Sequence, residues 1–203
     1  MAGMAIAAIV LIAVAIYSLS QLNTATWTSN LKDPVLNPSL RQDLPHFEYS
    51  DESKSLKAQN FEGKWTLLTF WAYWCGPCLE EMPALNQLGQ QWQGPEFNIV
   101  TVNIDDPKSE NYESARKFLT VNSVILPTLF DKTGELKRAF GVSDLPRHFL
   151  INPEAKIVWQ ATGAFKWSGS QAQAQLMKLM ENENEKEDAT ETQGQESEQE
   201  PEE

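Results

Sequence analysis

The chain has 203 residues and a net charge of −12, with 41% hydrophobic and 22% charged residues. That length allows one domain of ordinary size with appendages, or two small domains. The acidic balance argues against nucleic acid as a partner, because phosphate binding needs clustered lysine and arginine. Two cysteines are too few for a disulfide-dense secreted scaffold. Eleven of the 28 acidic residues lie in 181–203, so the rest of the chain is nearly neutral.

The two ends of the chain differ in composition from its centre. Residues 1–22 are uncharged and predominantly apolar, and long enough to span a bilayer as a helix. We interpret them as a transmembrane anchor, with a cleaved signal peptide as the alternative. Residues 23–43, rich in Asn, Thr, Ser and Pro, are typical of a linker. A globular domain is expected over 44–180, and 181–203 is predicted to be a disordered acidic tail, because it has almost no apolar surface to bury.

Within the central region the hydrophobic pattern alternates between strand and helix. Apolar or β-branched runs predict strands, and apolar residues at helical spacing predict helices. Strands are expected at 66–71, 97–104, 127–130, 148–151 and 156–160, and helices at 78–92, 109–119, 135–140 and 168–180. The last two strands flank a tight turn, which indicates a hairpin. This order predicts an α/β fold with a mixed central sheet.

Both cysteines lie in one motif, Trp74-Cys75-Gly76-Pro77-Cys78, between a predicted buried strand and a helix. Backbone N–H groups and the helix dipole stabilise a thiolate at a helix N-terminus, so its pKa falls below the free value of about 8.5. The spacing brings the second sulfur within reach of the first, and proline is tolerated in a first turn. We predict that Cys75 attacks a partner disulfide and Cys78 resolves the mixed disulfide. Trp74 is expected to flank the site and shape its docking surface.

Two other interpretations of this motif carry less weight. A zinc site would need further ligands, and the only histidines, His46 and His148, lack the paired spacing of such sites. A purely structural disulfide would close too short a loop to stabilise the fold much. We therefore expect neither a metal nor a bound cofactor.

Glu81 is the next candidate, because it lies three residues after Cys78 and shares a helix face with it. If that face points inward, desolvation raises the pKa of the carboxyl and suits it to move a proton to or from the resolving thiol. On spacing alone, a solvated helix charge like the neighbouring Glu80 is an equal alternative.

The segment 67–88, LLTFWAYWCGPCLEEMPALNQL, resembles the active-site segment of the thioredoxin superfamily, specifically its TlpA/ResA/DsbE-like branch of membrane-anchored or exported oxidoreductases. The matching positions are Phe70, Trp71, Ala72, Trp74, Cys75, Pro77, Cys78, Glu81 and Pro83. The resemblance implies a thioredoxin fold: a central mixed β-sheet with helices on both faces, an N-terminal extension and a central insertion near 126–142.

A second stretch, LPRHFLINPEAKIV, resembles the part of the family that holds its cis-proline, which would be Pro146. The resemblance places Pro146 opposite the cysteines and lets Leu145 offer backbone groups to a partner chain. Proline also denies a ladder donor, which leaves an edge open for an extended substrate. With Trp74, Gly76 and Pro77, these residues form the expected substrate-binding set.

Two positions depart from the family pattern. Thr69 stands where ordinary thioredoxins carry a buried aspartate, which shifts the proton-transfer role toward Glu81. Arg147 and His148 follow Pro146 where the branch has small or acidic polar residues, so partner selection stays open. His148 could titrate near the site. The plainer interpretation, which we prefer here, is a strand histidine that faces the far side of the sheet.

The sequence therefore predicts a membrane-tethered thiol-disulfide oxidoreductase on the outer (periplasmic or luminal) side of the cytoplasmic membrane. Because the CGPC motif resembles that of reducing thioredoxins, we expect it to reduce protein disulfides, for example in apocytochrome c, with a membrane protein as electron donor. One alternative is a disulfide oxidase or isomerase on the same fold. Others are a peroxidase of the peroxiredoxin kind, or an anchored docking module whose acidic tail recruits a basic partner.

Overall fold

The computed structural model of the chain describes residues 41–50, 55–170 and 172–183. The predicted anchor at 1–22 lies outside these residues, as do nearly all of the predicted linker and acidic tail. Within the described ranges, no helix has both the length and the apolar character that a membrane crossing requires.

A six-stranded sheet of order β1-β8-β7-β4-β5-β6 forms the centre of the domain. Its strands are β1 (Gln42–Asp43), β4 (Trp65–Trp71), β5 (Phe97–Asn103), β6 (Thr128–Phe130), β7 (Arg147–Ile151) and β8 (Lys156–Thr162). β5 pairs in parallel with β4 and β6, whereas β7 pairs antiparallel with β4 and β8. β1 pairs antiparallel with β8. The predicted mixed sheet is therefore confirmed, with each long strand within three residues of its expected bounds.

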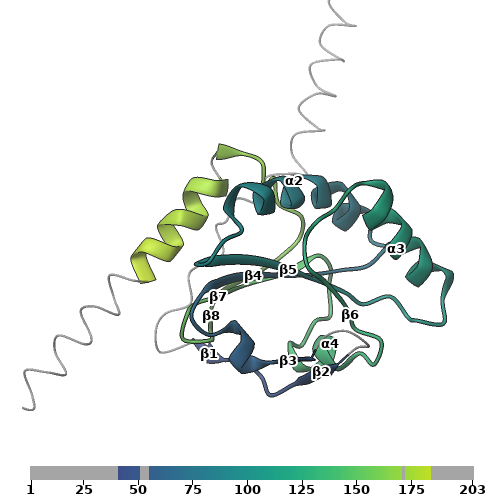
Figure 1. Cartoon of the computed structure of the whole chain (residues 1–203), viewed down its shortest axis with the longest axis horizontal. Helices are drawn as coiled ribbons and strands as arrows, with labels where there is room; N and C mark the ends of the chain where they lie inside the picture. Colours follow the sequence, from purple (N-terminus) through teal and green to yellow (C-terminus); the bar gives the residue numbers. More distant parts are fainter. Residues whose placement is uncertain (1–40, 51–54, 171, 184–203) are drawn as a thin grey trace, which may run out of the picture.

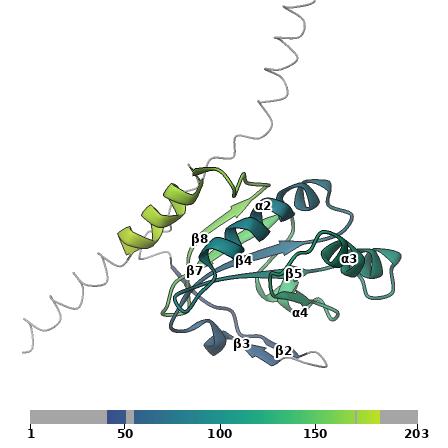
Figure 2. The ribbon, with the colours of Figure 1, turned by 45° about the horizontal axis from the view of Figure 1, so that its top comes forward.

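Helices cover both faces of this sheet, as predicted (Figure 1). One face carries α2 (Gly76–Trp92), α3 (Glu110–Val121) and a terminal helical segment (170 and 172–183). The other face carries α4 (Glu135–Ala139), the 3₁₀ helix η2 (Ala58–Phe61) and a hairpin of β2 (Glu48–Ser50) and β3 (Ser55–Lys57). Figure 2 shows the same layers from a second direction. The sheet thus separates two hydrophobic cores.

Strand β4 is buried along its whole length because both of its faces are covered. Leu67 and Trp71 point into the core beneath α2, while Leu68 and Phe70 point into the core beneath α4. A strand buried on both faces is a continuous apolar run rather than an alternating one. The end of β4 at Trp71 leads directly into the cysteine motif.

The folded domain extends further at both ends than the range 44–180 that was predicted for it. Residues 42–43, assigned to the linker, form β1 against β8. Residues 181–183, assigned to the tail, continue the terminal helix. Arg41 and Glu183 form an ion pair, and the Glu183 side chain is fully buried. This pair connects the start of the described chain to its end.

Asn86 on α2 holds the loop between α3 and β6. Its Nδ2 donates to the Ser123 carbonyl at 3.1 Å, and its Oδ1 accepts from the Ile125 N–H at 2.9 Å. Ser123 has a positive φ of 51°, which a side-chain-bearing residue rarely adopts. The buried amide therefore satisfies two backbone groups in a loop that has no regular structure of its own.

We predict that Asn86→Ala lowers the free energy of unfolding by about 1–3 kcal/mol, because it leaves both backbone groups without their partner. The control is Gln87→Ala at the next, exposed position of α2, where a change within about 0.5 kcal/mol is expected. Urea titrations at pH 7 measure both. Equal losses in the two variants would show that the Asn86 side chain does not hold the loop.

Candidate active site

The N-terminus of α2 holds the two cysteines. Cys75 is the N-cap residue, and the Cys78 N–H donates to its Sγ at 3.3 Å. A disulfide bond joins Cys75 to Cys78. Cys75 is 5% exposed and Cys78 is fully buried, so a partner meets Cys75 first. Pro77 lies in the first turn, where its missing N–H leaves no helical bond unmade.

This position has a direct electrostatic consequence for the reduced enzyme. The Cys78 N–H already points at the Cys75 sulfur, and the positive end of the helix dipole lies at the same place. Both favour a thiolate at Cys75 over a thiol. Trp74, which immediately precedes Cys75 in the chain, is 61% exposed.

The Leu145–Pro146 peptide bond is cis, as the resemblance implied. Pro146 directly precedes β7, and Arg147 at the start of β7 pairs with Phe70 near the end of β4. Leu145 and Pro146 therefore lie at the sheet end where β4 leads into the cysteine motif. Leu145 is half-buried, whereas Gly76 and Pro77 are exposed.

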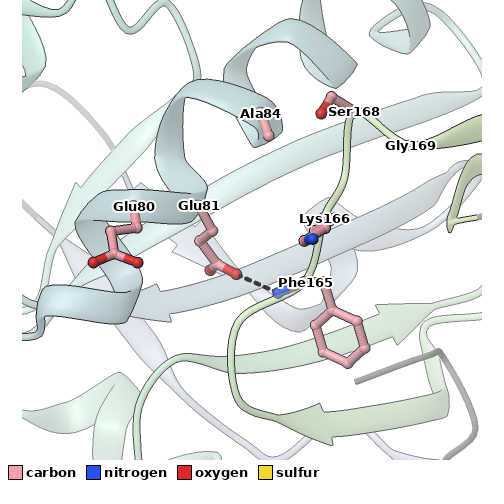
Figure 3. A pocket seen from close by; sticks show the side chains of 7 residues that line it. All are labelled: Glu80, Glu81, Ala84, Phe165, Lys166, Ser168 and Gly169. Carbon is pink, nitrogen blue, oxygen red and sulfur yellow. Dashed lines mark hydrogen bonds between the residues drawn. The ribbon is translucent and has the colours of Figure 1, made fainter. Parts of the chain in front are cut away.

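Glu81 points inward from α2, while Glu80 is exposed. The Glu81 Oε2 accepts a hydrogen bond from the Phe165 N–H at 3.0 Å (Figure 3). Burial raises the pKa of Glu81 to about 8, even though this hydrogen bond favours the ionised form. The nearby indole N–H of Trp167 makes no full hydrogen bond among the described residues, but it also favours the ionised form of Glu81. The carboxyl can therefore gain and lose a proton near neutral pH.

A cavity of about 520 Å³ lies between α2 and the segment that follows β8. Its walls are formed by Glu80, Glu81, Ala84, Phe165, Lys166, Ser168 and Gly169. In Figure 3, α2 contributes one wall and the 165–169 segment the other, with Glu81 directed across toward Phe165. Glu80, Glu81 and Lys166 are the ionisable residues of this lining, so the buried Glu81 carboxyl borders the cavity.

His148 lies under α2, which contradicts the expectation that it faces the far side of the sheet. It pairs with Thr69 in the β4–β7 register, and its Nδ1 is 3.1 Å from the Thr69 Oγ1. Its Nε2 is 3.1 Å from the Gly163 carbonyl and 3.6 Å from the Glu81 Oε2. Burial lowers the pKa of His148 to about 3, so the ring is neutral at physiological pH.

Sequence reasoning missed the segment after β8 as part of the site. It gave no part in the site to Gly163, Phe165 or Trp167. These residues supply backbone groups and ring edges, which no motif marks. The structure brings them to Glu81 because β8 runs beside β7. In the described part of the chain, no cluster of three or more His, Cys, Asp or Glu side chains could hold a metal ion.

The profile of the AhpC/TSA family matches residues 40–160, more than half of the chain. The chain belongs to the AhpC/TSA family. Among curated relatives of this AhpC/TSA protein, the thiol-disulfide oxidoreductase ResA of Bacillus thuringiensis subsp. konkukian is 31% identical over 123 residues, covering 60% of this chain and 69% of the relative. ResA of Bacillus subtilis is 33% identical over 122 residues, covering 60% and 66%.

Solved structures of thiol-disulfide exchange proteins are also similar to this chain. A Chlorobium tepidum structure assigned as thiol:disulfide interchange protein DsbE has a TM-score of 0.58 and 28% identity, covering 68% of this chain and 96% of that one. The exposed lipoprotein thioredoxin of Streptococcus pneumoniae has a TM-score of 0.53 and 27% identity, covering 67% and 98%. This AhpC/TSA protein therefore has the thioredoxin fold and is a thiol-disulfide oxidoreductase of the ResA/DsbE type.

The raised pKa of Glu81 predicts a specific pH dependence of stability. The folded state holds the Glu81 proton up to about pH 8, whereas the unfolded state loses it near 4.5. Folding stability from this group therefore falls as pH rises from about 4.5 to 8. Glu81→Gln removes this loss and keeps an acceptor for Phe165. The free energy of unfolding of the variant, minus that of the parent, should rise by about 1.4 kcal/mol per pH unit in this window. Between pH 4.5 and pH 7 the rise amounts to about 3 kcal/mol.

Urea unfolding of both oxidised proteins from pH 4 to 9 measures this difference. Glu80→Gln is the matched control, because Glu80 is the exposed neighbour. A difference between Glu81→Gln and the parent that stays constant with pH would mean that the Glu81 pKa is not raised.

Proposed function

We propose that this oxidoreductase reduces disulfides of partner proteins, with Cys75 as the attacking and Cys78 as the resolving cysteine. The observation that carries the proposal is the redox pair at the α2 N-terminus with a buried, proton-exchanging carboxyl three residues further along the helix. The CGPC motif resembles that of reducing thioredoxins, which supports reduction as the direction.

The first step takes place at Cys75. Its thiolate attacks one sulfur of the partner disulfide, forms a mixed disulfide and breaks the partner's S–S bond. The other partner sulfur leaves as a thiolate and takes a proton from solvent. Cys75 is slightly more accessible than the fully buried Cys78, and an N–H group is aimed at its sulfur; both observations support this assignment.

The second step takes place at Cys78 and involves Glu81. The Glu81 carboxylate takes the Cys78 proton, and the resulting thiolate attacks the Cys75 sulfur. The partner's remaining sulfur leaves as a thiolate and is protonated by Glu81 or by solvent. Two electrons pass to the partner, and the enzyme ends with the Cys75–Cys78 disulfide. With a pKa of about 8, roughly a tenth of Glu81 is ionised at pH 7, enough to serve as base and acid in turn.

The proposed substrate surface surrounds Cys75. Trp74, Gly76 and Pro77 are exposed on one side of it, and Leu145 and Pro146 lie at the adjoining sheet end. An extended segment of the partner would hydrogen-bond to the Leu145 backbone and pack against Trp74. Protein disulfides, including that of apocytochrome c, are the substrates we propose.

We propose that the domain works outside the cytoplasmic membrane, held by the anchor at 1–22 through the linker and re-reduced by a membrane electron donor. The apolar run at 1–22 supports the anchor. One similar protein, from Streptococcus pneumoniae, is an exposed lipoprotein. The acidic tail after residue 183 is proposed to stay solvated, because it carries almost no apolar side chains.

Trapping tests the assignment of the two cysteines. In Cys78→Ala the mixed disulfide on Cys75 has no resolving thiol, so we predict that disulfide-linked partners accumulate in cells and can be identified by mass spectrometry. The Cys75→Ala variant, which lacks the attacking sulfur, is the matched control and should trap none. Equal trapping by both variants would contradict the assignment of Cys75 as the attacking and Cys78 as the resolving cysteine.

Direction is tested by alkylating the cysteines of the native protein in cells. We expect the pair to be mostly reduced at steady state, because the electron donor of a reductase returns its cysteines to the dithiol form. A pair that stays oxidised, with no donor able to reduce it, would favour the oxidase or isomerase. A Cys75→Ser variant that keeps full cellular function would instead favour the docking module.

A further inference from the structure

His148 occupies the centre of the sheet face beneath α2. It is fully buried, and its neighbours in the sheet are Thr69 on β4 and Ala161 on β8. Its Nε2 lies 3.6 Å from the Glu81 Oε2. The imidazole is therefore a fully buried ionisable group beside the carboxyl to which we assign proton transfer.

The hydrogen bonds of the ring fix its tautomer. The Gly163 carbonyl, 3.1 Å from Nε2, can only accept, so Nε2 carries the hydrogen. Because the ring is neutral, Nδ1 is then an acceptor, and the Thr69 hydroxyl donates to it across 3.1 Å. Both nitrogens are engaged, and the Nε2–H is directed at Gly163 rather than at Glu81.

Burial disfavours a charged His148 ring, and the adjoining Arg147 guanidinium acts in the same direction. The Phe165 and Trp167 rings meet it edge-on, with centroids 5.1 Å and 5.2 Å away. Of the described charged groups, Glu81 faces it from α2 and Arg147 adjoins it on β7. The Arg147 guanidinium binds Gln160 and Thr162 of β8.

The remaining neighbours add no acidic group. Lys166, on the segment after β8, lines the cavity beside Glu81. β4 and β8 present Thr69 and Ala161, which carry no charge. Glu81 is thus the one carboxyl near the ring among the described residues.

We propose that His148 is a positioning residue for proton transfer at Glu81: a neutral imidazole, locked as the Nε2–H tautomer by Thr69 and Gly163, that places a dipole and no charge beside the carboxyl. This inference rests on the proposed role of Glu81. An imidazolium at this position would pair with Glu81 and hold it ionised. The neutral ring lets Glu81 take up and release its proton, and it holds the Gly163 end of the segment that brings Phe165 to Glu81.

Thr69 gains a function from this arrangement. An aspartate at its position, as in ordinary thioredoxins, would set a second carboxylate on Nδ1 and favour the doubly protonated, charged ring. A hydroxyl donates a hydrogen bond to Nδ1 and adds no charge. The Thr69–His148 pair is thus a matched departure from that pattern.

The tautomer is tested by NMR of the full chain labelled with ¹⁵N-histidine. The chain has two histidines, so His46→Gln assigns the His148 signals without altering the site. We expect ring nitrogen shifts of the neutral Nε2–H tautomer, unchanged from pH 5 to 8. Signals of an imidazolium, or of the Nδ1–H tautomer, would overturn the inference, and this test needs no variant at His148.

The effect on Glu81 is tested by the pH profile of the resolving step, followed as release of a fluorescent peptide from a preformed mixed disulfide on Cys75. The parent should show an inflection near pH 8. His148→Gln, whose amide can still donate to Gly163, should keep it within about 0.3 pH units. His148→Phe keeps the ring but loses the donor, and should raise the inflection by about one unit, a tenfold change in proton affinity.

The outcomes separate the inference from the function on which it rests. If the inflection persists in Glu81→Gln, the proposed role of Glu81 fails. If it disappears in Glu81→Gln but is unmoved in His148→Phe, the role of Glu81 stands and that of His148 fails. Near-UV circular dichroism confirms that each variant is folded, and a His148→Phe variant that does not fold leaves the NMR test to decide.

Discussion

The hydrogen bond from the Phe165 N–H to Glu81 joins the two parts of the molecule on which the site depends. Glu81 belongs to α2, whose first turn holds the cysteines, and Phe165 belongs to the segment that leaves β8. A buried carboxyl is costly unless it is protonated or hydrogen-bonded. Burial of Glu81 raises its pKa to about 8, while the Phe165 N–H and the Trp167 indole favour its ionised form. The same contact therefore anchors α2 and makes the carboxyl reactive.

Much of this arrangement could be predicted from the sequence because it is local. The apolar run of β4, the cysteines at the start of a helix and the three-residue spacing to Glu81 all follow from short-range pattern. The strand β1 could not, because two residues carry no pattern and are ordered only by pairing with β8. Likewise, the buried Glu183 at the end of the terminal helix looks like part of an acidic tail until Arg41 is placed beside it.

The orientation of His148 shows a second limit. In a strand with one solvated face, alternation of polar and apolar residues reveals which side chains point inward. β4 is buried on both faces and β7 nearly so, which leaves no such alternation to interpret. Only the Thr69–His148 register, together with the position of α2, places the imidazole beside Glu81. The departure at Thr69 was visible in the sequence, but its connection to His148 was not.

The central proposal is that Glu81 exchanges a proton with the Cys75–Cys78 pair, and the pH dependence of the reduction potential of this pair tests it most directly. A couple of two electrons and two protons shifts by about 59 mV per pH unit. Because a thiolate at the start of the same helix raises the Glu81 pKa further, the parent curve should separate from that of Glu81→Gln between about pH 7 and 9. Parallel curves across that range would contradict the account.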